Sequence, residues 1–280
     1  MPTFEHGGLT FHYLDQSSNA ERRPLVPFVI QHGIGGTVRQ PSSLMVPLPG
    51  FVRLVALDSR GHGETRPTAQ PDTLRFETYA DDVIALMDRL DLSRAVVGGI
   101  SMGAGIALNL ALRFPERVAG LVLSRPAWLA GPMAAEHLYR QIAGLLRKAG
   151  PVEGRKMFAA TPEYQKVEAV SPDAAKSLLG QFDEPRALED VTRLEFLSAD
   201  SPFSLLADLR TIQAPTLVLA TDQDPVHPLA YGRVLARHVP KARFLETTSK
   251  SKSPEGHQHE MRQAIASFLE TFLPQFPVGS

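Results

Sequence analysis

The chain has 280 residues, of which 43% are hydrophobic and 21% charged, with a formal net charge of -1. This length suits a single domain with an insertion, and interspersed charges near balance exclude the basic surfaces expected of nucleic-acid or membrane-surface binding. The absence of cysteine excludes disulfide scaffolds, thiolate catalysis and thiolate metal sites. No targeting segment and no apolar run long enough to span a bilayer is recognisable, so the sequence predicts a soluble, cytoplasmic protein without a nucleic-acid or membrane partner.

Short apolar runs recur along most of the chain. Residues 3–6 and 9–15 flank Gly7 and Gly8 and predict a β-hairpin at an antiparallel sheet edge. Further strands are predicted at six places separated mostly by helical patterns: 26–31, 52–58, 95–100, 118–124, 215–221 and 242–247. Such alternation predicts an α/β fold whose mostly parallel, eight-stranded sheet is covered by helices on both faces.

Two helices are predicted from the spacing of their apolar side chains. One would present Tyr79, Val83, Leu86 and Leu90 on a single face, and the other Ile265, Phe268, Leu269 and Phe272. Residues 127–203 break the alternation, because they hold helical patterns divided by prolines and no convincing strand. We expect a helical lid at 127–203, inserted between core segments 1–126 and 204–280.

The segment Gly99-Ile100-Ser101-Met102-Gly103 places a serine between two glycines, after an apolar run and before a helix-forming one. This G-x-S-x-G pattern is typical of a nucleophile elbow, in which a strained strand-to-helix turn needs small residues on either side of the serine. Three further segments complete a candidate site: His32-Gly33, Asp222-Gln223-Asp224-Pro225 and Gly256-His257.

These segments, together with the Asp58 to Gly63 turn, resemble the α/β-hydrolase superfamily, in particular its small cofactor-free esterases, enol-lactonases and non-haem perhydrolases. The resemblance covers about residues 25–125 and 215–273. It implies the α/β-hydrolase fold with a lid, and a serine hydrolase that cleaves a small-molecule ester or lactone through an acyl-enzyme, with no cofactor and no metal.

A serine hydroxyl needs a base, and the base needs a carboxylate that fixes its tautomer. We expect Ser101 to be the nucleophile, His257 the base and Asp224 the carboxylate, because Asp224 matches the D-x-D-P turn of the family. Asp222 is the less favoured carboxylate. His259 competes with His257, since the polar loop before Gly256 is long and the helix that follows begins early.

The remaining histidines are given other roles. His32 is expected to shape the oxyanion loop and His62 to hold a turn, whereas His227 and His259 are left as pocket-lining or surface residues. The backbone N–H groups of Ile34 and Met102 are the predicted oxyanion hole.

Two residues beside the predicted triad are candidates for substrate binding. Arg125 follows a strand, where its guanidinium would grip a substrate carboxylate or take part in an ion pair, and Trp128 would wall the pocket or pack in the core. The elbow itself leaves C–C bond hydrolysis, perhydrolysis and a low-turnover binding role open. Substrate identity and oligomeric state stay open as well.

Overall fold

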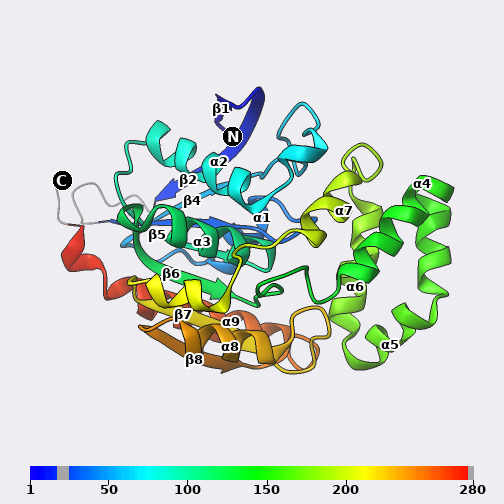
Figure 1. Cartoon of the computed structure of the whole chain (residues 1–280). Helices are drawn as coiled ribbons and strands as arrows, with labels where there is room; N and C mark the ends of the chain where they lie inside the picture. The colour runs from blue at the N-terminus through cyan, green and yellow to red at the C-terminus, as the bar shows by residue number, and fades with distance from the viewer. Residues whose placement is uncertain (18–24, 277–280) are drawn as a thin grey trace.

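The computed structural model describes residues 1–17 and 25–276. Its centre is an eight-stranded sheet in the order β1-β2-β4-β3-β5-β6-β7-β8 (Figure 1). The strands are β1 Thr3–His6, β2 Leu9–Ser17, β3 Val26–Gln31, β4 Val52–Leu57, β5 Ala95–Ile100, β6 Val118–Ser124, β7 Thr216–Thr221 and β8 Ala242–Thr247. β1 and β2 pair antiparallel to each other and β2 pairs antiparallel to β4, whereas the other pairs are parallel. The predicted fold class and its hairpin edge are confirmed.

Alternate side chains of the central strands point to two separate cores. Val29 and Val97 face the core shared with helices α2 Phe76–Arg89 and α3 Met102–Arg113. Their neighbours Phe28 and Val96 face the core shared with α9 Pro254–Glu270. Because both faces are covered, every residue of β3, β5, β6 and β7 is buried, which explains their nearly continuous apolar sequence.

Two shorter helices complete these layers, α1 Arg39–Leu44 beside α9 and α8 Leu229–His238 against β7 and β8. In α2, Tyr79, Val83 and Leu86 are buried as the spacing predicted. The predicted C-terminal helix is present as α9. It contains Ile265, Phe268 and Leu269, but it ends at Glu270, so Phe272 lies beyond its end.

Four helices lie between β6 and β7, and we call them the cap: α4 Glu136–Ala159, α5 Pro162–Val170, α6 Pro172–Asp183 and α7 Thr192–Ala199. They lie beyond one end of the sheet in Figure 1. α4 is kinked at Gly150, whose φ is 72°, directly before Pro151. No strand is found in the cap, although the exact boundaries of the insertion stay a prediction.

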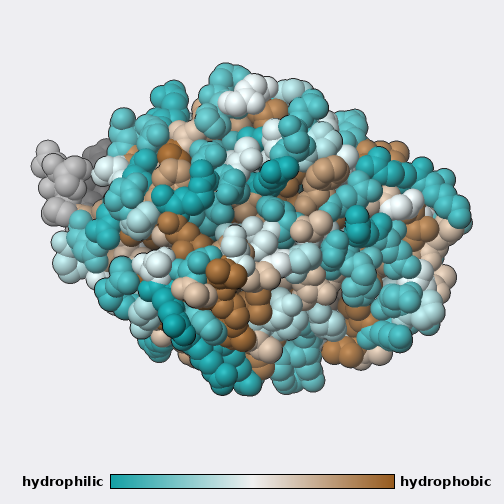
Figure 2. Space-filling view, in the orientation of Figure 1, coloured by the Kyte–Doolittle hydropathy of each residue, from teal (hydrophilic) through white to brown (hydrophobic). Residues whose placement is uncertain are grey.

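The surface in Figure 2 is mostly hydrophilic, with hydrophobic residues in small separate areas. Within residues 1–17 and 25–276, no helix is long and apolar enough to cross a membrane.

Candidate active site

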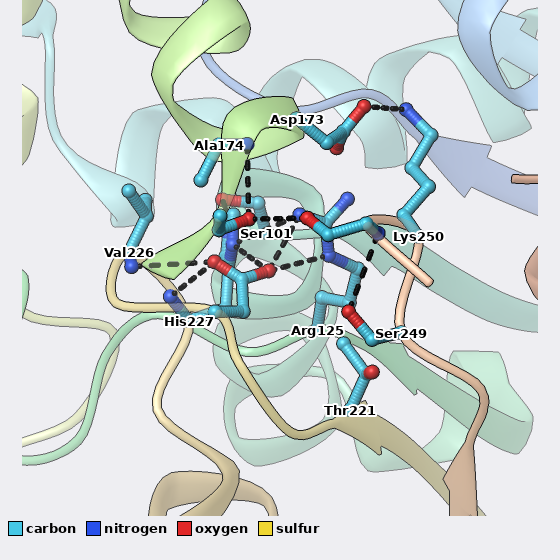
Figure 3. A network of polar contacts seen from close by, with 12 residues as sticks. Ser101, Arg125, Asp173, Ala174, Thr221, Val226, His227, Ser249 and Lys250 are labelled. Atoms are coloured by element: carbon cyan, nitrogen blue, oxygen red, sulfur yellow. Dashed lines mark hydrogen bonds and ion pairs between the residues drawn. The ribbon is translucent and has the colours of Figure 1, made fainter. Parts of the chain in front are cut away.

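Ser101 lies in a sharp turn between β5 and α3 (Figure 3). Its φ of 56° is in the left-handed region, which few residues other than glycine adopt. A Cβ atom on Gly99 would collide with the backbone of Gly103, and a Cβ on Gly103 would collide with the backbone oxygen of Gln31. The turn therefore requires both glycines, as expected from the motif.

The side chain beside the Ser101 hydroxyl is that of His227. The Nε2 atom of His227 is 2.9 Å from Ser101 Oγ, and its Nδ1 atom is 2.9 Å from Asp224 Oδ2. An ionised carboxylate only accepts hydrogen bonds, so Nδ1 carries the proton and Nε2 is left to accept from the serine hydroxyl. Ser101, His227 and Asp224 thus form a continuous hydrogen-bonded chain.

The turn after β7 brings Asp224 and His227 together. Asp224 Oδ1 accepts hydrogen bonds from the backbone N–H groups of Val226 and His227, both at 3.2 Å. This folds the chain back on the carboxylate within three residues, as aspartate commonly does in turns. Asp222 points elsewhere and forms an ion pair with Lys252 at 2.7 Å.

Arg125 completes the site from the end of β6. Its Nε and Nη2 atoms donate to Asp224 Oδ2 at 3.0 and 2.6 Å, and Nη2 is 3.3 Å from His227 Nδ1. Both partners of the ion pair are largely buried. Of the two roles considered for Arg125, the structure places it in the ion pair, where its guanidinium holds a carboxylate of the protein itself.

Burial and charge set the protonation of this cluster. Burial opposes ionisation of Asp224, but His227, which is protonated at the low pH where this carboxyl titrates, and Arg125 outweigh burial through their charges and hydrogen bonds. They hold the pKa of Asp224 well below its usual range. Burial lowers the pKa of His227, and the charge of Arg125 adds to this effect against the opposing influence of Asp224. At neutral pH the imidazole is therefore neutral and able to accept a proton.

His257 does not occupy the predicted place beside Ser101. Helix α9 begins at Pro254, and the Ser253 side chain accepts from Gly256 N–H at 3.0 Å, so His257 falls inside the first helical turn. Its Nδ1 atom is 2.9 Å from the backbone oxygen of Thr248, which holds the ring against the preceding loop. The prediction that His257 pairs with Ser101 is wrong. Helix α9 begins before His257, which places this residue in the helix and not in the preceding loop.

The other weighed histidines are also placed elsewhere. His259 is exposed on α9. His32 is fully buried, with Nδ1 2.8 Å from Gly33 O and with Nε2 accepting from Ser59 N–H at 3.1 Å. His62 is buried next to it, with ring centroids 5.0 Å apart. His32 and His62 join the loops after β3 and β4, in line with the structural roles expected of them.

The predicted oxyanion donors remain available. Within the described parts of the chain, the N–H groups of Ile34 and Met102 have no hydrogen-bond partner in the protein. Met102 is the first residue of α3, where the helix dipole favours negative charge.

The cap covers the site from two sides. Ser171 Oγ, at the start of α6, is 2.9 Å from Ser251 Oγ, and Lys250 forms an ion pair with Asp173 at 3.0 Å (Figure 3). Gln181 Nε2, further along α6, donates to the backbone oxygen of Ile34 at 3.2 Å. Ser101 is only 7% exposed.

A family model described as the alpha/beta hydrolase fold matches residues 26–252. The chain belongs to this family. Among curated relatives, the dihydrolipoyllysine-residue acetyltransferase component of the acetoin cleaving system of Pseudomonas putida is 29% identical over 74% of this chain and 54% of that protein. The chain thus spans about half the length of that relative. The 3-oxoadipate enol-lactonase 2 of Acinetobacter baylyi is 28% identical over 77% of this chain and 79% of the relative.

Solved structures agree on the fold. The enol-lactonase of Burkholderia xenovorans superposes on this α/β hydrolase with a TM-score of 0.68 and 22% identity, over 98% of each chain. At that identity the likeness shows the fold alone. The family and its enol-lactonase relative support a hydrolase.

Trp128 lies in the core of this α/β hydrolase. It is 1% exposed, and its ring packs edge-on against Phe76 with centroids 5.2 Å apart. Its indole Nε1 is buried without a partner in the described structure. The predicted role of Trp128 as a substrate contact gives way to the packing role that was weighed beside it.

His227 is the site residue that sequence reasoning missed. The signal was local, because an aspartate that folds a turn brings the residue three positions later to its own carboxylate. No local pattern in the sequence indicates that His227 contacts Ser101, because the two residues are 126 positions apart.

Proposed function

We propose that this chain is a serine hydrolase that cleaves a carboxylic ester or lactone of a small molecule, with Ser101 as nucleophile, His227 as general base and Asp224 as the orienting carboxylate. The observation that carries the proposal is the chain of two 2.9 Å contacts from Ser101 Oγ through His227 to Asp224. The name of the enol-lactonase relative supports a lactone or ester as the substrate class.

The first half of the reaction forms an acyl-enzyme. Ser101 Oγ attacks the carbonyl carbon while its proton passes to His227 Nε2, and the resulting oxyanion accepts from the N–H groups of Ile34 and Met102. The imidazolium then donates its proton to the leaving oxygen as the C–O bond breaks. From a lactone, the released hydroxyl stays attached to the acyl group.

The second half reverses these roles. His227 removes a proton from a water molecule, which attacks the acyl carbon. The imidazolium then returns that proton to Ser101 Oγ as the bond between the acyl carbon and Oγ breaks and the acid is released. Asp224 stabilises the imidazolium in both halves, and Arg125 keeps that carboxylate ionised and fixed. A site covered by the cap favours small substrates over polymers.

The test uses a fluorophosphonate probe and a panel of p-nitrophenyl esters and lactones with the wild-type protein and Ser101→Ala. We expect stoichiometric labelling of the wild type, seen as a mass increase on the peptide holding Ser101, with turnover of some panel members. Both should be lost in Ser101→Ala while its circular dichroism spectrum stays unchanged. Equal turnover by Ser101→Ala would refute the proposed nucleophile, and labelling without turnover would favour a binding role.

A further inference from the structure

The last turn of α6 lies against the loop that carries the predicted oxyanion donor Ile34. Gln181 is 3% exposed, and its Nε2 atom donates to the backbone oxygen of Ile34 at 3.2 Å. A Cβ atom on Gly35 would lie only 2.4 Å from the same Nε2 atom, so the amide of Gln181 packs directly over the Gly35 backbone. A buried amide of the cap thus contacts the oxyanion loop, which we define as residues 32–36.

The two preceding peptide groups of this loop are fixed by the core. Gln40 Oε1, in α1, accepts from the N–H group of Gly33 at 2.8 Å. The backbone oxygen of Gly33 accepts from the N–H group of Gly36 at 2.9 Å and lies 2.8 Å from His32 Nδ1. Since His32 Nε2 already accepts a hydrogen bond, Nδ1 carries the proton and donates to Gly33. A trans peptide group points its N–H away from its oxygen, so these bonds set the direction of the Ile34 N–H.

The peptide group between Ile34 and Gly35 depends on the cap. Within the described residues, Gln181 is the only hydrogen-bond partner of its oxygen, and its N–H has none in the protein. Glycine adopts a wide range of backbone dihedral angles, and Gly35 already has a φ of 76°. Without the amide of Gln181, the chain on this side of Ile34 would therefore be free to rotate.

Small movements of the loop matter because it lies beside the nucleophile. A Cβ atom on Gly33 would be 3.4 Å from Ser101 Cβ. A displacement of about 1 Å in a catalytic site can lower the rate about 10²-fold. The position of the Ile34 N–H relative to Ser101 is thus a quantity on which the rate depends.

We propose that Gln181 is a positioning residue of the oxyanion hole, whose amide fixes the peptide group after Ile34 to the cap and so holds the Ile34 N–H where the oxyanion forms. This inference rests on the proposed function, because the oxyanion arises only if Ser101 attacks a carbonyl. It gives the cap a part in the reaction besides covering the site. Gln181 acts on the transition state through the loop, so its loss should lower kcat and leave KM unchanged.

The test compares the wild-type protein with Gln181→Met, which keeps the length of the side chain and removes its donor. Loss of an oxyanion donor costs about 10²- to 10³-fold in kcat, and a misplaced donor should cost less. We expect kcat for the best p-nitrophenyl ester to fall at least about fivefold, with KM within about twofold. A trifluoromethyl ketone adds to the serine and leaves an oxyanion in the hole. Its affinity should fall by the same factor as kcat/KM.

Thr68→Val is the matched control. Thr68 Oγ1 accepts from Arg186 Nη2 at 2.6 Å, a contact between the core and the cap segment that follows α6. The substitution keeps the shape of the side chain and removes a cap-to-core hydrogen bond outside the oxyanion loop, so kcat should stay within about twofold of the wild type. Equal falls in Thr68→Val and Gln181→Met would overturn the proposal in favour of a general loosening of the cap.

Gln181→Glu makes the donor depend on pH, and it tests the proposal if Gln181→Met fails to fold. Burial raises the pKa of a carboxyl, and the neutral acid can donate its O–H to the Ile34 oxygen, whereas the carboxylate only accepts. The ratio of kcat/KM in Gln181→Glu to that of the wild type should therefore fall as pH rises through the pKa of this carboxyl. A ratio near one from about pH 5 to about pH 9 would overturn the proposal.

Two results with Gln181→Met would overturn this inference alone. One is a wild-type kcat, and the other is a loss found only in KM, which would mean that Gln181 contacts the substrate itself. In both cases the wild-type protein still hydrolyses the ester and is labelled at Ser101, so the proposed function stands. A wild-type protein that is neither labelled nor active would instead overturn the proposed function and this inference with it.

Discussion

Replacing His227 and His257 one at a time separates the arrangement in the structure from the one that the family resemblance predicted. His227→Gln removes the imidazole Nε2 that lies 2.9 Å from Ser101 Oγ and the Nδ1 that lies 2.9 Å from Asp224. A positioned general base contributes about 10²- to 10⁴-fold to rate, so kcat and kcat/KM should both fall by about that factor. KM should change little, because proton transfer occurs only in the transition state.

His257→Gln is the matched control. His257 is buried, and the polar contact of its side chain is a hydrogen bond to the backbone oxygen of Thr248 rather than a contact with Ser101. Losing that bond should cost about 0.5–1.5 kcal/mol of the free energy of unfolding and leave kcat/KM within a few-fold of the wild type.

The assay is steady-state hydrolysis of the best p-nitrophenyl ester together with the rate of fluorophosphonate labelling, on variants whose urea unfolding curves have been measured. A large loss in His257→Gln with near-normal activity in His227→Gln would refute the reasoning. Such a result would mean that the loop after β8 rearranges to deliver His257 to Ser101.

Three other changes follow from the same contacts. Arg125→Gln removes a cation that disfavours the imidazolium of His227, so the pKa of His227 should rise. The acid limb of the pH profile of kcat/KM should then move to higher pH, and an unchanged limb would show that the charge of Arg125 does not act on His227. Gly99→Ala places a Cβ against the backbone of Gly103 and should lower the free energy of unfolding in urea by about 3 kcal/mol or more. A loss near zero would contradict the close approach of Gly99 and Gly103 in the turn at Ser101. Trp128→Phe removes a buried N–H that has no partner in the described structure, and should lower the free energy of unfolding by less than about 1.5 kcal/mol. Trp128→Ala, which leaves a cavity, should lower it by about 3–5 kcal/mol. Thermal unfolding of the two variants measures the difference, and equal losses would contradict the packing role of Trp128.

Local patterns in the sequence were sufficient for the sheet and the elbow. Each predicted strand is present, most with bounds that agree to within a residue, because a buried strand needs apolar side chains on both faces wherever it lies. The Gly99 and Gly103 requirement was equally local, since it arises from a turn that closes within five residues.

The sequence by itself therefore determined the α/β class and the strand-to-helix turn at Ser101, whereas the preference for Asp224 over Asp222 came from the family's D-x-D-P turn. Only the tertiary structure decided that His227 meets Ser101, that Arg125 pairs with Asp224 and that Trp128 packs in the core. The physical reason is that each contact joins segments far apart in sequence: Ser101 and His227 follow β5 and β7, which flank β6 in the sheet, and Arg125 follows β6 itself. Their geometry depends on where neighbouring helices begin, as the start of α9 at Pro254 shows for His257.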